Sequence, residues 1–100
     1  MSKWEVCLAD VPFEEIAASK IRPVLILDDS AVLIDCLKLT SHGPRPGEYV
    51  LQDWQACGLK KQTTVRLSKR LALPNTRIIK KIGTLSILDI AEIQKRLIRR

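Results

Sequence analysis

Two apolar runs on either side of a short polar turn place the tightest restriction on how this chain folds. Residues 21–27 and 31–39 have the length and apolar character of strands, and Asp28-Asp29-Ser30 between them has the composition of a turn. Such a pair predicts an antiparallel hairpin. A residue before proline favours extended backbone, so Arg22, which precedes Pro23, is expected at the mouth of the first strand.

Shorter segments of the same character predict further strands and the loops between them. Alternating apolar and polar residues indicate half-buried strands. The predicted strands are residues 4–9, 48–51, 62–68 and 77–82, with Pro12 ending the first. Residues 41–47, with two glycines and two prolines, predict the clearest loop, and residues 13–20 predict another.

The last element is predicted to be a helix. Ser86 is a suitable N-cap, and Asp89 three residues later completes a variant of the capping box. Ile90, Ile93 and Leu97 then fall on one helical face and predict its buried side. One hundred residues are enough for one domain, so we expect a single mainly β domain over residues 1–100, with a C-terminal helix.

The charge is distributed unevenly along the chain. The net charge is +6, but residues 1–58 hold five basic and nine acidic side chains, whereas residues 59–100 hold twelve basic and two acidic ones. A strongly basic half indicates a polyanionic partner. No apolar run reaches the ~18 residues of a membrane span, and the N-terminus lacks the pattern of a secretory signal. We therefore expect a cytoplasmic protein with no membrane association.

The cysteines do not predict a disulfide framework or a metal site. Cys7, Cys36 and Cys57 are odd in number and widely spaced, with no CxxC pair. Together with His42 they could supply four zinc ligands, but structural zinc sites usually bring their ligands in close pairs. We expect three buried thiols in a reducing compartment, no metal and no cofactor.

Polar residues at strand ends beside loops are the candidates for chemistry. They are Arg22, the run Thr40-Ser41-His42, and the strand face Thr64, Arg66 and Ser68. The chain lacks the glycine-rich nucleotide-binding motifs and the common hydrolase motifs. By themselves these residues indicate only a small basic β domain.

Five motifs occur in a fixed order along the chain. They are Trp4-Glu5-Val6 with Val11-Pro12-Phe13, the segment 19–27 around Arg22-Pro23, Leu39-Thr40-Ser41, the segment 56–67 ending in Val65-Arg66-Leu67, and the segment 81–86 before the helix. In this order they resemble the PemK/MazF family of toxins from toxin–antitoxin systems. The resemblance extends from about residue 4 to residue 97.

The resemblance implies an SH3-like small barrel of the PemK/MazF/CcdB type that pairs as a homodimer. It also implies a toxin that acts as a metal-independent endoribonuclease on single-stranded RNA such as mRNA, leaving 2′,3′-cyclic phosphate and 5′-hydroxyl ends, and a cognate antitoxin protein as partner. The family's catalytic arginine and threonine fall on Arg22 and Thr40. Ser41, Thr64, Arg66 and Ser68 fall where family members contact RNA.

Two departures from the family pattern leave the general acid and base open. The loop before Arg22-Pro23 has no histidine, and Ser68 stands where some members have an acidic residue. Glu14, Glu15 or His42 are the alternatives, or Arg22 and Thr40 act largely by electrostatics. The rival hypotheses are a non-catalytic module on the same barrel, such as a gyrase poison or an inactive remnant, and a basic nucleic-acid binder unrelated to toxins.

Overall fold

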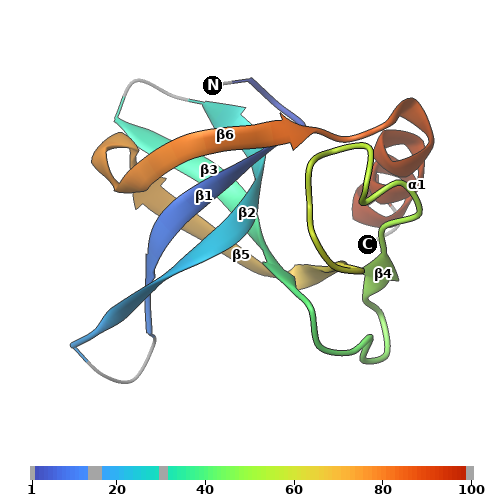
Figure 1. Ribbon diagram of the computed structural model, residues 1–100, viewed down its shortest axis with the longest axis horizontal. Helices are drawn as coiled ribbons and strands as arrows, with labels where there is room; N and C mark the ends of the chain where they lie inside the picture. The colour runs from blue at the N-terminus through green and yellow to red at the C-terminus, as the bar shows by residue number, and fades with distance from the viewer. Residues whose placement is uncertain (1, 14–16, 30–31, 99–100) are drawn as a thin grey trace.

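A computed structural model describes residues 2–13, 17–29 and 32–98, which form a curved antiparallel sheet with a helix beside it (Figure 1). The elements are β1 (Glu5–Pro12), β2 (Ser19–Asp29), β3 (Leu33–Thr40), β4 (Tyr49–Val50), β5 (Thr64–Pro74), a 3-10 turn (Asn75–Arg77), β6 (Ile78–Thr84) and α1 (Ile87–Ile98). The strand order is β4-β5-β3-β2-β1-β6, so β4 and β6 are the two ends of a sheet that curls without closing. The predicted fold class, mainly β with a C-terminal helix, is confirmed.

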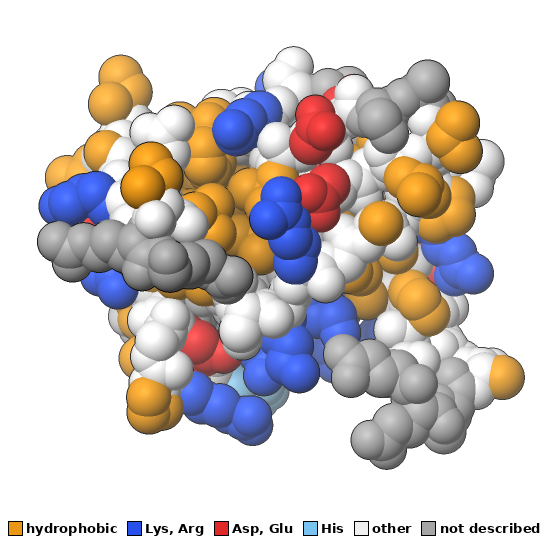
Figure 2. Space-filling view, turned by 180° about the vertical axis from the view of Figure 1, so that it is seen from behind, with side chains coloured by type: hydrophobic (Ala, Val, Ile, Leu, Met, Phe, Trp, Pro, Cys, Tyr) orange, Lys and Arg blue, Asp and Glu red, His pale blue; other side chains and the backbone are white. Residues whose placement is uncertain are grey.

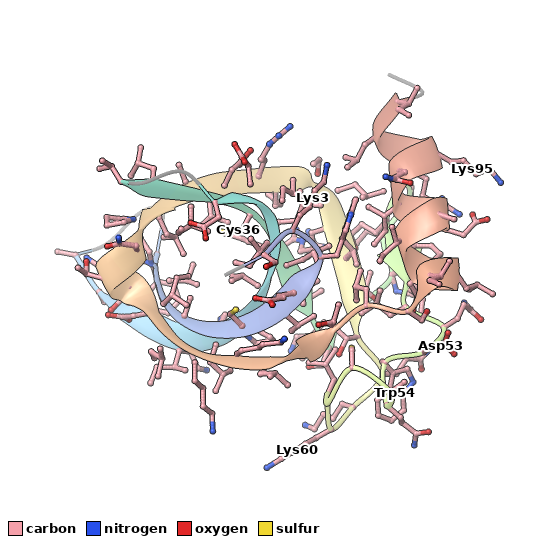
Figure 3. All side chains as sticks on the ribbon, turned by 90° about the horizontal axis from the view of Figure 1, so that it is seen from above. Lys3, Cys36, Asp53, Trp54, Lys60 and Lys95 are labelled. Carbon is pink, nitrogen blue, oxygen red and sulfur yellow. The ribbon has the colours of Figure 1, made fainter. Side chains whose placement is uncertain are left out.

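The sheet buries side chains on both of its faces. One cluster includes Val6, Leu37 and Val65 and extends to Ile93 of α1. The other lies inside the curl, where Cys36 is labelled in Figure 3, and includes Cys7 and Ile26. Strands that are buried on both faces need apolar residues at consecutive positions. This is why the two apolar runs of the central hairpin show so little alternation.

Three strands are longer than the sequence pattern predicts. The predictions were wrong at residues 19–20, at residues 69–74 and at residues 83–84, which all lie in strands, whereas β1 ends at Pro12 as predicted. In each case a neighbouring strand supplies the pairing: Pro12 pairs with Ser19 across β1 and β2, and Pro74 pairs with Leu33 across β5 and β3. Pairing with an adjacent strand depends on the whole sheet. It overrides the low strand propensity of proline and of segments whose composition is typical of loops.

The helix forms as predicted, and it is short and partly exposed. Ile93 is fully buried, while Ile90 and Leu97 are partly buried and pack against the same cluster.

No helix among the described residues has the length and apolar character required to cross a membrane. The segment between β4 and β5 lies close to β6, as a Cβ built on Gly83 would clash with the carbonyl oxygen of Cys57.

A buried carboxylate on the helix joins α1 to β4 and to the segment that follows β4. Asp89 is 0% exposed, and its Oδ1 accepts hydrogen bonds from the Tyr49 hydroxyl at 2.6 Å and the Gln52 N–H at 2.9 Å. Its Oδ2 accepts from the Asp53 N–H at 2.9 Å, and its own N–H donates to Ser86 Oγ at 3.2 Å. Burial and this contact raise the pKa of the Tyr49 hydroxyl.

Replacing Asp89 with alanine is expected to destabilise the protein by about 3 kcal/mol, because a buried hydroxyl and two backbone N–H groups lose a charged acceptor. Urea unfolding followed by circular dichroism measures the change. Glu92→Ala is the control on the same helix, since Glu92 forms only surface ion pairs with Lys95 and Arg96, and its expected cost is below about 0.5 kcal/mol. Equal costs for the two variants would contradict the structural role of Asp89.

Candidate functional site

A groove of about 590 Å³ lies between the β1–β2 hairpin and the loop that follows β3. In Figure 1 the hairpin and the loop extend from the same side of the sheet. Arg22 and Pro23 of β2 line the groove together with Lys38 and Thr40 of β3. The groove is therefore built where the central strands of the sheet end and the two connecting segments begin.

Strand pairing brings Arg22 and Thr40 to this groove. Val24 on β2 pairs with Lys38 on β3. Arg22 lies two residues before Val24, and Thr40 lies two residues after Lys38. Side chains two positions apart share a face of a strand, so the register directs both residues to the same face, at the open end of the hairpin. Arg22 is exposed and Thr40 is partly buried.

The Thr40 hydroxyl is fixed by the loop that follows it. Its Oγ1 accepts a hydrogen bond from the backbone N–H of His42 at 3.1 Å. A threonine hydroxyl has one proton to donate in addition to its acceptor lone pairs. Thr40 therefore keeps a donor for a ligand, while the bond from His42 sets the position of the oxygen. The His42 side chain also lines the groove.

A bulge in β5 adds two cations to the groove. Leu37 pairs with Arg70, but the next residue of β3, Lys38, pairs with Arg66, so residues 67–69 of β5 have no partner in this register. In a regular strand, Arg66 and Lys69 would point to opposite faces. With the bulge between them, both residues line the groove.

Glu48 connects the loop after β3 to Arg66. Its Oε1 accepts a hydrogen bond from the Arg45 N–H at 3.0 Å, and its Oε2 accepts from Arg66 Nε at 3.0 Å. The Glu48 side chain is 7% exposed, and that of Arg66 is 26% exposed. The Arg45 N–H first, and then the Arg66 guanidinium, hold the pKa of the Glu48 carboxyl below its ordinary value.

The groove is strongly basic. Its described lining includes the cations Arg22, Lys38, Arg45, Arg66 and Lys69, against the single carboxylate of Glu48. Figure 2 shows blue Lys and Arg side chains gathered around the pale-blue histidine on this part of the surface. A concave surface lined by cations attracts a polyanion and orients its phosphates.

The other predicted site residues lie around the groove rather than in it. Ser41 is exposed in the loop after β3. Thr64 pairs with Thr40 and is only 4% exposed. Ser68 lines a neighbouring hollow of about 370 Å³ that shares Lys38 and Lys69 with the groove. Glu14 and Glu15, two alternatives for the acid or base, fall outside the described residues.

Sequence reasoning missed four charged groove residues: Lys38, Arg45, Glu48 and Lys69. The bulge that brings Lys69 to the groove has no signature in strand alternation. Lys38 is one of two charged residues, with Asp35, within the apolar run of residues 31–39. The Gly/Pro composition of residues 41–47 could have pointed to Arg45, because structured loops beside strand ends commonly carry binding residues, and Glu48 directly follows this loop.

The cysteines are buried and do not assemble a metal site. Cys7, Cys36 and Cys57 are free thiols, and burial raises the pKa of the Cys36 thiol to about 12. Burial also raises the pKa values of Cys7 and Cys57. Within residues 2–13, 17–29 and 32–98, no group of three or more His, Cys, Asp or Glu side chains is arranged to hold a metal ion.

Comparisons with known proteins find one matching family and solved structures with a similar fold. The model of the PemK-like, MazF-like toxins of type II toxin–antitoxin systems matches residues 2–99. An endoribonuclease solved in complex with its cognate antitoxin, from a mycobacterial species, superposes with a TM-score of 0.76 at 14% identity, covering 97% of this chain and 90% of that chain. The Mycobacterium tuberculosis toxin MazF-mt6 superposes with a TM-score of 0.71 at 16% identity, covering 91% of each chain. No curated protein sequence matches significantly.

Replacing Glu48 with glutamine is expected to destabilise the protein in a pH-dependent way. The folded-state pKa of Glu48 lies below its ordinary 4.5, so the carboxylate contributes stability above that value and loses it as the pH falls through the folded-state pKa. Urea unfolding of both proteins from about pH 7 down to about pH 3 measures the difference, which should shrink on acidification. A difference that stays constant with pH would contradict the ionic role of Glu48.

Proposed function

The chain belongs to the PemK-like, MazF-like toxins of type II toxin–antitoxin systems, and we propose that it is a metal-independent endoribonuclease that cleaves single-stranded RNA such as mRNA. The observation that carries this proposal is the groove itself, in which Arg22 and Thr40 lie together among four further cations. A single strand of RNA presents a flexible row of phosphates, and this is the kind of ligand that such a lining favours.

The proposed reaction uses the RNA itself as nucleophile. The 2′-hydroxyl attacks the adjacent phosphorus and loses its proton, and the bond to the 5′-oxygen breaks as that oxygen gains a proton. The products are a 2′,3′-cyclic phosphate and a 5′-hydroxyl, so neither water nor a metal enters this step. The protein has to stabilise the extra negative charge on the phosphorane and to assist the two proton transfers.

Arg22 is the proposed stabiliser of the phosphorane. Its planar guanidinium matches two phosphate oxygens and supplies the positive charge that a phosphorane requires. It is exposed at the groove, where a phosphate can reach it. Thr40 is the proposed second catalytic residue, because its hydroxyl is held by the His42 N–H and keeps a proton to donate to a phosphate oxygen.

The remaining groove residues are proposed to hold the RNA. Arg66 lines the groove and takes part in binding, as do the exposed hydroxyls of Ser41 and Ser68 beside it. Thr64 pairs with Thr40 and is only 4% exposed, so a contact with RNA at this residue requires the residues that cover it to move. His42 lies in the groove and stays a candidate acid or base, together with Glu14 and Glu15.

We also propose a cognate antitoxin as protein partner. One structural relative was solved with its cognate antitoxin, and the basic groove of this chain favours a partner segment that is acidic where it docks. Such a segment would block RNA from Arg22 and Thr40. A homodimer in the cytoplasm is the assembly and compartment we propose for the toxin.

Arg22→Ala is expected to slow RNA cleavage by about a hundredfold or more, because the phosphorane loses a charged donor. Wild type and variant are incubated with a long single-stranded RNA in EDTA, and the cleavage ends are mapped. Arg77→Ala is the matched control: Arg77 pairs with Asp10 and does not line the groove, so cleavage should change by less than about threefold. RNA that stays intact with wild type, while still bound, would support the non-catalytic hypothesis instead.

Thr40→Val is expected to slow cleavage by about tenfold or more while leaving the fold intact, because valine keeps the branched shape and removes the hydroxyl. Thr40→Ser keeps the hydroxyl and should retain most of the rate. Single-turnover cleavage rates with thermal melting of each variant measure the two effects. A valine variant as fast as the serine variant would remove Thr40 from the reaction.

A further inference from the structure

Glu48 is out of place in a groove that attracts polyanions. The carboxylate lies among five cations of the described lining, and its charge opposes the approach of a phosphate. By charge alone, a protein that binds RNA would do better with a neutral residue here. The contacts of Glu48 suggest what it provides in exchange for this electrostatic cost.

Both oxygens of Glu48 are engaged by different parts of the groove. Oε1 accepts from the backbone N–H of Arg45, three residues earlier in the loop, and Oε2 accepts from the Nε–H of Arg66 on β5. The side chain is 7% exposed, so solvent competes little for these bonds. The Glu48 carboxylate therefore fixes the loop that contains Arg45 and the Arg66 side chain relative to each other.

The bond to Arg66 also determines which way the guanidinium points. A guanidinium offers five N–H donors in a rigid fork. The carboxylate takes the Nε–H, which leaves the two terminal NH2 groups at the far end of the fork to bond a ligand. Lys38 lies directly across the strand pair from Arg66, and Glu48 offsets the repulsion that would push the two cations apart.

A role for Glu48 as general base fits these contacts poorly. A general base near neutral pH needs a raised pKa and a free oxygen. The pKa of Glu48 is lowered by the Arg45 N–H and by Arg66, and both oxygens already accept bonds.

We propose that Glu48 is a positioning residue, which holds the Arg66 guanidinium and the loop of residues 43–47 in the arrangement that binds single-stranded RNA. This inference rests on the proposed function and deepens it. It assigns to Glu48 an effect on RNA binding that is opposite in sign to the effect of its charge.

The test measures the affinity of Glu48→Gln for a labelled single-stranded oligonucleotide that is 2′-O-methylated and cannot be cleaved. The glutamine carbonyl keeps an acceptor for the Arg45 N–H, but its NH2 group cannot accept from Arg66. Binding is expected to weaken by about three- to tenfold, although the loss of a negative charge makes the variant one unit more positive. Tighter binding, as charge alone predicts, would overturn the proposal.

Glu5 provides a matched control with the same chemistry outside the groove. Its Oε1 accepts from the backbone N–H of Ser2, three residues earlier, and its Oε2 pairs with Lys81 at 3.1 Å. Glu5 does not line the groove. Glu5→Gln should leave the affinity unchanged or slightly raised, and a loss equal to that of Glu48→Gln would overturn the proposal.

A double-mutant cycle with Arg66→Ala separates positioning from a general loss of structure. If Glu48 acts through Arg66, adding Glu48→Gln to Arg66→Ala should cause no further weakening. Additive losses, or wild-type affinity in Arg66→Ala, would overturn the proposal. Thermal melting of each variant ensures that only folded protein is compared.

The binding assay keeps this inference separate from the proposed cleavage. Wild type that binds the oligonucleotide but fails to cut natural RNA would refute the endoribonuclease and leave the Glu48 comparison valid. Wild type that cuts RNA while Glu48→Gln binds as well as wild type would refute the positioning role alone. Absence of oligonucleotide binding by wild type would refute the positioning role directly.

Discussion

The buried carboxylate of Asp89 is the interaction on which the rest of the structure depends. The sheet would present its second apolar face to water without α1, yet the helix is short and several of its apolar side chains are exposed. Ile93 is fully buried and Ile90 and Leu97 only partly, and apolar packing of this kind has little directional preference. Asp89 supplies it, by accepting bonds from Tyr49, Gln52 and Asp53 within one buried site. A charge buried in this way is tolerated only when its acceptor capacity is used, so the carboxylate selects one docking geometry.

The contact between Asp89 and Tyr49 also affects the groove, because Tyr49 directly follows Glu48 in the chain. Tyr49 is the first residue of β4, a strand of only two residues that pairs with the start of β5. Glu48 comes directly before it and bonds Arg66, one residue after the Val65 that pairs with Tyr49. An anchor on the helix thus fixes the short strand, and the short strand fixes the carboxylate of Glu48 in the groove. Variants of Asp89 are for this reason expected to disturb the groove as well as stability.

Local sequence explains the hairpin and the helix, but it does not explain the charge arrangement of the groove. The apolar runs around Asp28-Asp29-Ser30 and the Ser86 cap are local signals, and they predict β2, β3 and α1. The proline after Arg22 predicts that Arg22 lies at the mouth of its strand, and Thr40 is predicted to lie at the end of the next strand. Lys69 depends instead on a bulge that appears only when β5 pairs with β3. Glu48 depends on a loop closing onto β5, a contact between residues 18 positions apart in sequence. Non-local pairing decides both, and no periodicity encodes it.

Arg22 and Thr40 are thus positioned by different parts of the fold from the other groove cations. Arg22 and Thr40 are placed by the pairing of two long central strands, which a change in a surface loop does not easily move. Arg66, Lys69 and Arg45 are placed by a bulge, a two-residue strand and a Gly/Pro loop, and of these the loop is the element that tolerates substitution and insertion. In the proposed function, the first group holds the reacting phosphate and the second group holds the flanking nucleotides. Substitutions in the Gly/Pro loop are therefore expected to change the preference for flanking nucleotides more than the reaction itself.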